Sequence, residues 1–224
     1  MPNPALERTE RSRLKRLPRR GHYDFDTVAA ILDAGFLCHV GYVIDGAPLV
    51  TPTSYWREGR RVYWHGSHAS RMLNAEKGGA PVCLTVSHLD GLVMARSAFH
   101  HSINYRSVML FGAAHRVDDS GHKLAALKAF VERMYPGRWG MLRPVTKKEV
   151  RATMVLWMDI DEGSAKVRSG PPIDDTPDYA LPIWAGVIPL RMVAGKALDD
   201  PQLSPGLAPP RGLVNLSHVG LARK

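Results

Sequence analysis

The chain is organised around short apolar runs, rich in β-branched and aromatic residues, that alternate with compact polar turns. Runs of this length and composition are typical of β-strands. Dipeptides such as Asp45-Gly46, Glu58-Gly59 and Asp90-Gly91 are typical of tight turns between antiparallel neighbours. The pattern predicts strands over residues 36–44, 47–56, 61–65, 81–87, 92–97, 105–117, 153–160 and 183–193.

Three segments instead repeat their apolar positions at helical spacing. The first covers residues 24–34, where Asp24 suits the N-cap position and Gly35 the C′ position. The second covers residues 67–77, and the third, over 121–135, has the strongest helical pattern. Its apolar stripe, which by default faces a core, consists of Leu124, Leu127, Val131 and Met134.

Strands joined mainly by hairpins predict an antiparallel sheet rather than a doubly wound parallel one. We therefore expect a mainly β fold of the α+β type, a β-barrel with peripheral helices. Gly112, inside the longest predicted strand, indicates a bulge or bend. We divide the chain into a basic N-terminal arm (1–20), one barrel domain (21–195) and an extended tail rich in Pro and Gly (196–224).

The net charge of +9 is unevenly distributed. Residues 1–20 contain seven Lys or Arg and two Glu, whereas the rest of the chain is close to balanced. A basic arm can bind nucleic acid or an anionic surface, or it can be a solvated tail that packs along a partner subunit. We favour the second interpretation, and nucleic acid is an unlikely partner.

The apolar runs are too short for a membrane protein. None approaches the roughly 20 uncharged residues that cross a bilayer, and the N-terminus has no apolar leader. The sequence predicts a cytoplasmic protein with no membrane partner. Cys38 and Cys83 lie in separate apolar strands and are expected to be buried free thiols.

The segment 65–71 is the first candidate site, because it lies where a predicted strand gives way to a helix. Free backbone N–H groups at such a junction suit a phosphate, and Arg71 can add a two-pronged charged contact. The other candidate ligands here are His65, Ser67 and Ser70. The alternative is ordinary serine capping beside a surface arginine.

The segment 99–108 is the second candidate site, because polar and aromatic residues crowd the start of an apolar strand. Such a cluster suits a lined cleft. His100 and His101 are adjacent, so at most one faces a given ligand, and either can simply be a surface residue. Trp184 can form the wall of a flat pocket or belong to the core. The other candidate ligands are Asn104, Tyr105, Arg106 and Ser107.

Other common chemistries have no support in the sequence. The ten histidines are scattered without metal-ligand spacing, and we predict no metal site. No nucleophile-elbow, dinucleotide-binding or P-loop motif is present.

Taken in order, the distinctive segments resemble the pyridoxamine 5′-phosphate oxidase-like FMN-binding proteins, in particular the nitroimidazole-resistance or flavin-nucleotide-binding branch. The resemblance implies an FMN-binding split β-barrel and a homodimer with FMN at its interface. It extends over 17–193 and rests on Leu17-Pro18-Arg19-Arg20-Gly21, Cys38-His39-Val40-Gly41, His65-Gly66-Ser67, Ser70-Arg71, Arg96-Ser97-Ala98-Phe99-His100-His101, Asn104-Tyr105-Arg106-Ser107-Val108 and Trp184-Ala185-Gly186.

The resemblance also implies roles for individual residues. Ser70 and Arg71 would hold the flavin phosphate, and Pro52, Thr53 and Ser54 would run beside the ring and ribityl chain. Arg106 and Ser107 would contact the flavin, and Trp184 would lie beside it from the partner subunit. The oxidase has an acidic residue ahead of the glycine in its long strand, whereas this chain has Phe111 before Gly112. We therefore assign no vitamin substrate.

The function expected from the resemblance is an FMN-dependent oxidoreductase, in which the flavin accepts hydride and His100 or His101 faces the substrate as proton donor or anchor. The substrate, electron donor and acceptor are not specified. Two alternatives stay open: a split barrel that binds haem or a deazaflavin, and a non-catalytic flavin-binding or regulatory protein that uses its basic arm on nucleic acid.

Overall fold

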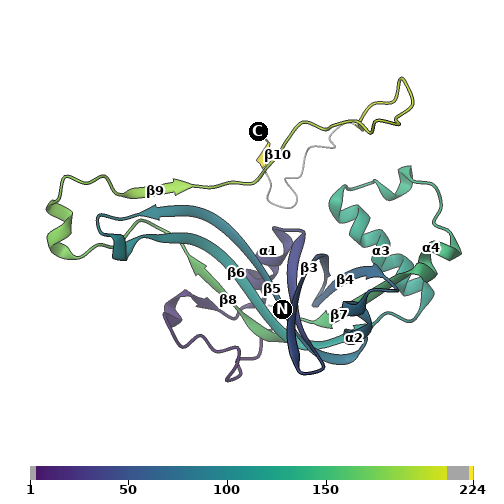
Figure 1. Ribbon diagram of the computed structural model, residues 1–224, viewed down its shortest axis with the longest axis horizontal. Coiled ribbons are helices and arrows are strands. Elements are labelled where there is room, and N and C mark those ends of the chain that lie inside the picture. Colours follow the sequence, from purple (N-terminus) through teal and green to yellow (C-terminus); the bar gives the residue numbers. More distant parts are fainter. Residues whose placement is uncertain (1–3, 211–221, 224) are drawn as a thin grey trace.

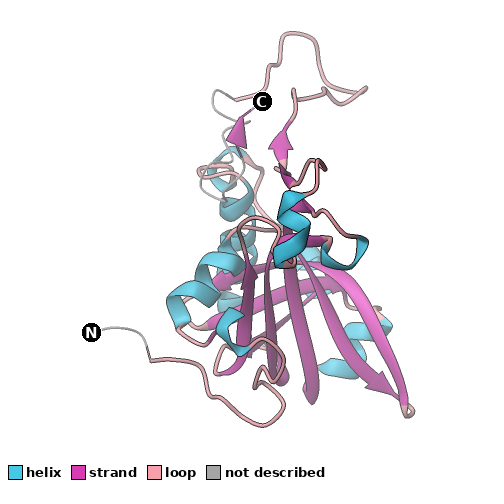
Figure 2. Ribbon diagram, turned by 90° about the vertical axis from the view of Figure 1, so that its left-hand side faces the viewer, coloured by secondary structure: helices cyan, strands magenta, loops and turns pink. Residues whose placement is uncertain are grey.

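The computed structural model describes residues 4–210 together with 222 and 223, and it is dominated by one antiparallel sheet (Figures 1 and 2). The sheet contains β1 (Gly21–His22), β2 (Leu37–Ile44), β3 (Ala47–Glu58), β4 (Arg61–Ser67), β5 (Gly78–Met94), β6 (Ser102–Arg116), β7 (Thr153–Asp159), β8 (Glu162–Arg168) and β9 (Gly186–Pro189). A separate short pair consists of β10 (Val193–Ala194) and β11 (Ala222–Arg223).

The sheet closes into a barrel. Strands pair in the order β6–β7–β4–β3–β2–β5, and β5 pairs with β6 again to complete the ring. Alternate residues of each strand point inward and form an apolar core. Representative members, each at most 1% exposed, are Val40, Trp64, Leu84, Val108 and Leu110. The expected mainly β, α+β fold is confirmed.

The helices lie at the periphery of the barrel (Figure 1). The predicted Asp24 N-cap of α1 is confirmed, since its carboxylate accepts a hydrogen bond from the Thr27 amide at 2.8 Å. α2 is shorter than predicted, because Ser67 still belongs to β4 and Ser70 is the N-cap. The four helices are α1 (Phe25–Asp33), α2 (Arg71–Glu76), α3 (Ser120–Met134) and α4 (Lys147–Ala152).

The predicted core stripe of α3 is only partly correct. Leu124 and Met134, at its two ends, are 39% and 41% exposed. Ala126 is buried instead, and Leu127 and Phe130 pack beside it against an aromatic cluster on the sheet. The contact face is set by the shape of that cluster, which the period of the helix alone does not reveal.

Two predictions in the central hairpin are wrong. The strands expected over 81–87 and 92–97 are one strand, β5, and Asp90-Gly91 is not a hairpin turn. The register shifts between Leu89 and Gly91 but the pairing with β6 continues on both sides. Asp90-Gly91 forms a bulge rather than a turn, because β6 pairs with β5 on both sides of the dipeptide.

No bulge interrupts the strand at Gly112, since Gly112 pairs regularly with Val82. Its lack of a side chain has a packing reason instead. A Cβ at this position would lie 2.7 Å from Met158 Cγ, so the methionine occupies the space that a side chain would need.

The sequence patterns missed β8 and α4. The run beginning Glu162-Gly163-Ser164 has little β character, but it pairs with β6 over seven positions. α4 is stabilised by a capping box in which Thr146 and Glu149 exchange hydrogen bonds.

A substitution at Gly163 tests how tightly β8 packs on β6. A Cβ here would lie 2.5 Å from the Met109 carbonyl oxygen and 2.8 Å from Leu110 Cδ2. We expect Gly163→Ala to lower the free energy of unfolding by about 2 kcal/mol, because backbone must move to relieve the overlap. Denaturant unfolding measures the change. Gly140→Ala is the control, since nothing lies within 4 Å of the position that its methyl group would occupy; equal stabilities of the two variants would contradict the packing argument.

Part of the N-terminal segment packs against the barrel of its own chain. Leu6 is 4% exposed, and the Glu7 amide donates to the Asp161 carbonyl at 2.6 Å. Arg11 contacts Glu162 with both its Nε, at 2.7 Å, and its Nη2. These contacts place one basic residue of the predicted N-terminal arm, Arg11, against β8.

Beyond the closed part of the barrel, β5 and β6 continue as a long arm, distinct from the N-terminal arm, with β8 paired to β6 and β9 paired to β5 (Figure 1). The chain following β8 is fixed to this arm by Arg96, whose backbone amide and Nη1 both donate to the buried Asp174 at 3.0 Å. Residues 195–210 form no helix or strand. Cys38 is buried and Cys83 half-buried, and neither is in a disulfide. Among the described residues, no helix has the length and apolarity to cross a membrane.

Candidate functional site

The turn between β4 and α2 is built by hydrogen bonds from its own backbone. The His68 amide donates to the Ala152 carbonyl at 2.9 Å, which ties the turn to the start of β7. The Ala69 amide donates to Ser67 Oγ at 3.2 Å, and the Ser70 amide donates to the Ser67 carbonyl at 2.9 Å. The turn is therefore held in one conformation without the help of a ligand.

The end of this turn leaves donors available. Ser70 Oγ accepts a hydrogen bond from the Leu73 amide at 3.4 Å, so the serine caps α2 as the alternative interpretation predicts. The amides of Arg71 and Met72 have no partner among the described residues. The Arg71 side chain is exposed and forms no ion pair with any residue that the structure describes. The turn thus offers two amides and, on the adjoining side chain, an exposed guanidinium, which are donor types that bind a phosphate.

His65 lies on β4, shortly before these donors in the chain. Its ring contacts Phe130 of α3, with centroids 4.6 Å apart, and the edge of Trp56 at 5.7 Å. Burial lowers the pKa of this imidazole, and its Nδ1 is buried without a hydrogen-bond partner among the described residues. His65 is therefore a buried imidazole whose charged form is disfavoured.

Below the turn, α2 carries a buried carboxyl group. Glu76 is 0% exposed, and its Oε2 accepts a hydrogen bond from Trp64 Nε1 at 3.1 Å. Oε1 has no partner among the described residues. Burial raises the pKa of Glu76 to about 7. The sequence analysis did not single out Glu76, because its burial depends on Trp64 of another element.

The three candidate residues on β3 lie beside β2. Pro52 is opposite His39, Thr53 is opposite Cys38, and Ser54 is opposite Leu37. Pro52 is exposed, whereas Thr53 and Ser54 are half-buried. The first of them therefore lies on the outer surface of the barrel, where a planar ligand could approach.

Two of the candidates on β6 form hydrogen bonds within the arm. The buried Asn104 side chain donates to the Gly170 carbonyl at 3.1 Å and accepts from Arg168. Ser107 Oγ donates to the Lys166 carbonyl at 3.3 Å. Tyr105, between them, is half-buried.

His100, His101 and Trp184 lie at the far end of the arm. His100 Nε2 is 3.3 Å from Asp175 Oδ2, and His101 Nδ1 is 2.9 Å from the Ser97 carbonyl oxygen. Trp184 is 67% exposed, so it is not a core residue. Figure 1 shows this end of the arm on the opposite side of the barrel from α2. Within one chain, the residues of the phosphate turn and those at the far end of the arm therefore form two separate groups.

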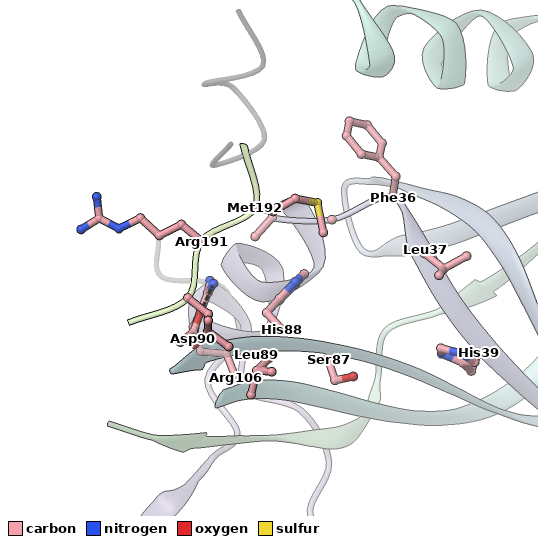
Figure 3. Close-up of a pocket in the computed structure, with 13 residues that line it drawn as sticks. Phe36, Leu37, His39, Ser87, His88, Leu89, Asp90, Arg106, Arg191 and Met192 are labelled. Carbon is pink, nitrogen blue, oxygen red and sulfur yellow. Dashed lines mark hydrogen bonds and ion pairs between the residues drawn. The ribbon is translucent and has the colours of Figure 1, made fainter. Parts of the chain in front are cut away.

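A cavity of about 660 Å³ on the outside of the barrel is lined by neither group (Figure 3). Its floor is the start of β2 and the middle of β5, and the segment Leu190–Met192 passes over it. Arg106 is the predicted residue that lines it, held by Asp90 through bonds of 2.9 and 2.8 Å. The sequence analysis missed His39 and His88; the signal for His39 was a histidine on the outward face of an alternating strand.

Comparison with known proteins gives consistent matches. A family model described as pyridoxamine 5′-phosphate oxidase matches residues 24–167. The flavocytochrome Anf3 from Azotobacter vinelandii is 49% identical, with 92% of this chain and 96% of that chain covered and a TM-score of 0.88. An FAD- and haem-binding protein from Mycobacterium smegmatis is 36% identical, with 88% and 97% covered and a TM-score of 0.84.

A more distant match shows the fold alone. A putative 5-nitroimidazole antibiotic resistance protein from Bacteroides thetaiotaomicron is 22% identical, with 66% of this chain and 86% of that chain covered and a TM-score of 0.54. No curated protein matches the chain.

Proposed function

Because the chain belongs to the pyridoxamine 5′-phosphate oxidase family and has a split β-barrel fold, we propose that it is a flavin-binding oxidoreductase that also carries a haem. The flavin assignment rests on the free amides and the exposed Arg71 at the turn between β4 and α2. The haem assignment is supported by the two relatives, 49% and 36% identical, that are described as a flavocytochrome and an FAD- and haem-binding protein. Ten histidines offer axial ligands.

The chemistry of the bound flavin is hydride or electron transfer, and the protein supplies binding and orientation. Arg71 and the neighbouring amides hold the phosphate group that FMN and FAD share. FMN is the flavin that we propose, and Pro52, Thr53 and Ser54 lie beside its ring and ribityl chain. His65, whose pKa is lowered by burial, lies shortly before the phosphate turn in the chain.

We further propose that two chains form a homodimer with the flavin between them. The outer face of the barrel presents apolar side chains that a monomer would leave in water: Val43 is 62% exposed and Val50 67%. In the dimer that we propose, Ser107, Trp184 and the exposed His101 of one chain lie beside the flavin held at the phosphate turn of the other. In that arrangement His101 faces the substrate.

The apolar face gives a direct test of the dimer. We expect Val50→Asp to convert the dimer to monomer at micromolar concentration and to release the flavin, because it buries an unpaired carboxylate at the interface. Sedimentation or light scattering gives the mass, and absorbance near the flavin bands gives occupancy. Leu198→Asp, at a side chain 92% exposed on the tail, is the control. A dimeric, fully loaded Val50→Asp protein would refute the interface.

The chromophores of the purified protein test the function itself. We expect a flavin absorption spectrum together with a haem Soret band. Mass spectrometry of the released cofactors distinguishes FMN from FAD. A colourless protein that binds neither added flavin nor added haemin would contradict the proposal.

A further inference from the structure

The cavity outside the barrel has the dimensions of a cofactor site. Its volume of about 660 Å³ lies within the range of pockets that enclose small cofactors, roughly 300–1,000 Å³. It is separate from the phosphate turn, because none of the residues from 65 to 71 lines it. A second ligand can therefore be present together with a flavin phosphate.

Much of its lining is apolar and uncovered. Leu37, Leu89 and Met192 are 58%, 48% and 73% exposed, and they lie on three different segments around the space (Figure 3). Phe36 and Leu190 extend the same lining. A flat apolar ligand inserted here would remove these side chains from water, which is the main stabilising contribution to binding in such pockets.

The two histidines of the cavity differ in how they are held. His88 Nε2 lies 2.9 Å from the Ile31 carbonyl oxygen, and its Cε1 is so close to Gly35 that a Cβ there would meet it at 2.7 Å. His39 has no hydrogen-bond partner among the described residues and lies on the exposed face of β2 with Leu37. The imidazole of His39 is therefore free to coordinate a metal, whereas that of His88 is fixed to the protein.

Two arginines, Arg106 and Arg191, also line the cavity. Arg106 is neutralised by Asp90, but Arg191 on the covering segment is exposed and forms no ion pair within the described chain. The cavity thus combines an apolar lining, an imidazole without a partner and an arginine at its edge. These features together fit a flat apolar ligand that contains a metal and has carboxylates at its edge. Haem has this combination.

We propose that this cavity is the haem site, with His39 as an axial ligand and Arg191 beside a propionate. The inference rests on the proposed function, of which it specifies the second cofactor site. The strand register supports a short path between the cofactors, because His39 lies opposite Pro52 and Leu37 opposite Ser54, on the strand proposed to run beside the flavin.

Replacing His39 with glycine tests the assignment in the intact protein. We expect His39→Gly to lose the Soret band or shift it markedly, while the flavin content of the purified protein stays unchanged. Added imidazole should restore the band, since a free imidazole can occupy the vacated axial position. His115→Gly, at an exposed strand histidine of β6 that does not line the cavity, is the matched control. Haem content is measured by pyridine haemochrome, independently of any activity.

Other outcomes would overturn the proposal in distinguishable ways. An unchanged Soret band in His39→Gly would place the haem elsewhere. Loss of flavin together with haem in this variant would mean that the cavity holds the flavin ring. A wild-type protein that contains flavin but takes up no haemin would refute the haem site and leave the flavin proposal intact. A protein that takes up neither cofactor would refute both.

Discussion

Replacing Arg71 with alanine is expected to weaken flavin binding about 100-fold. A charge-assisted hydrogen bond to a phosphate contributes roughly 1.5–3 kcal/mol, and about 1.4 kcal/mol corresponds to a tenfold change in affinity. Arg71 can form two such bonds, and no acidic residue among the described ones competes for its guanidinium. Titration of the apoprotein with FMN, followed by flavin fluorescence, gives the dissociation constants.

The comparison needs a variant that loses the same charge elsewhere. Arg13→Ala is suitable, because Arg13 is also exposed and forms no ion pair within the described residues. We expect Arg13→Ala to bind FMN as the wild type does. Riboflavin, which lacks the phosphate, should bind wild type and Arg71→Ala with equal affinity. If Arg71→Ala bound FMN normally, the phosphate would lie elsewhere.

Replacing Glu76 with glutamine is expected to stabilise the protein at pH 8 by about 3 kcal/mol and to remove much of its pH dependence between about pH 4.5 and 7. Burial raises the pKa of Glu76 to about 7, against 4.5 for the exposed side chain. Over that interval the folded protein holds a proton that the unfolded chain has released. The contribution of Glu76 to stability therefore falls as pH rises from 4.5 to 7, and is constant above and below.

The magnitude follows from the separation of the two pKa values, at about 1.4 kcal/mol for each pH unit. Glutamine reproduces the neutral carboxyl group, and its oxygen can keep the hydrogen bond from Trp64. Denaturant unfolding at a series of pH values measures the effect.

Glu58→Gln is a close control, because Glu58 accepts a hydrogen bond from an indole, that of Trp56 at 2.9 Å, but lies at the exposed end of β3. We expect this variant to retain the wild-type dependence of stability on pH. If Glu76→Gln showed the same slope as the wild type and Glu58→Gln, burial would not control the ionisation of Glu76.

The phosphate turn and the buried carboxyl group of Glu76 are linked by α2. Arg71 is its first residue and Glu76 its last, so ionisation of the buried carboxyl and binding of a phosphate act on opposite ends of one short helix. The Arg71 and Glu76 variants separate these effects, since the first changes affinity for the phosphate and the second changes stability. Measuring FMN affinity of Glu76→Gln at pH 5 and pH 8 shows how far one end senses the other.

Several features were readable from the sequence because they depend on neighbours in the chain. Asp45 and Gly46 adopt positive φ angles of 50° and 78°, as their hairpin signal predicts, and Asp24 caps α1. The turn over 65–71 was recognised as a candidate phosphate site from its serines and arginine, and the structure gives it free donors. Backbone turns and caps satisfy their hydrogen bonds within a few residues, so short patterns determine them.

Other features required the tertiary structure, because long-range pairing and packing determine them. Asp90-Gly91 has the residues of a hairpin turn, but unbroken pairing with β6 makes it a bulge. Glu76 has an ordinary place in a helical pattern, but Trp64 and the barrel core bury it. His39 joins Arg191 around one cavity only because a segment about 150 residues later folds back over β2. The sequence by itself determined most of the strands, the local turns and the candidate anion-binding junction. Only the tertiary structure decided which side chains are buried and which residues far apart in the sequence are in contact, because burial and contact depend on the whole chain.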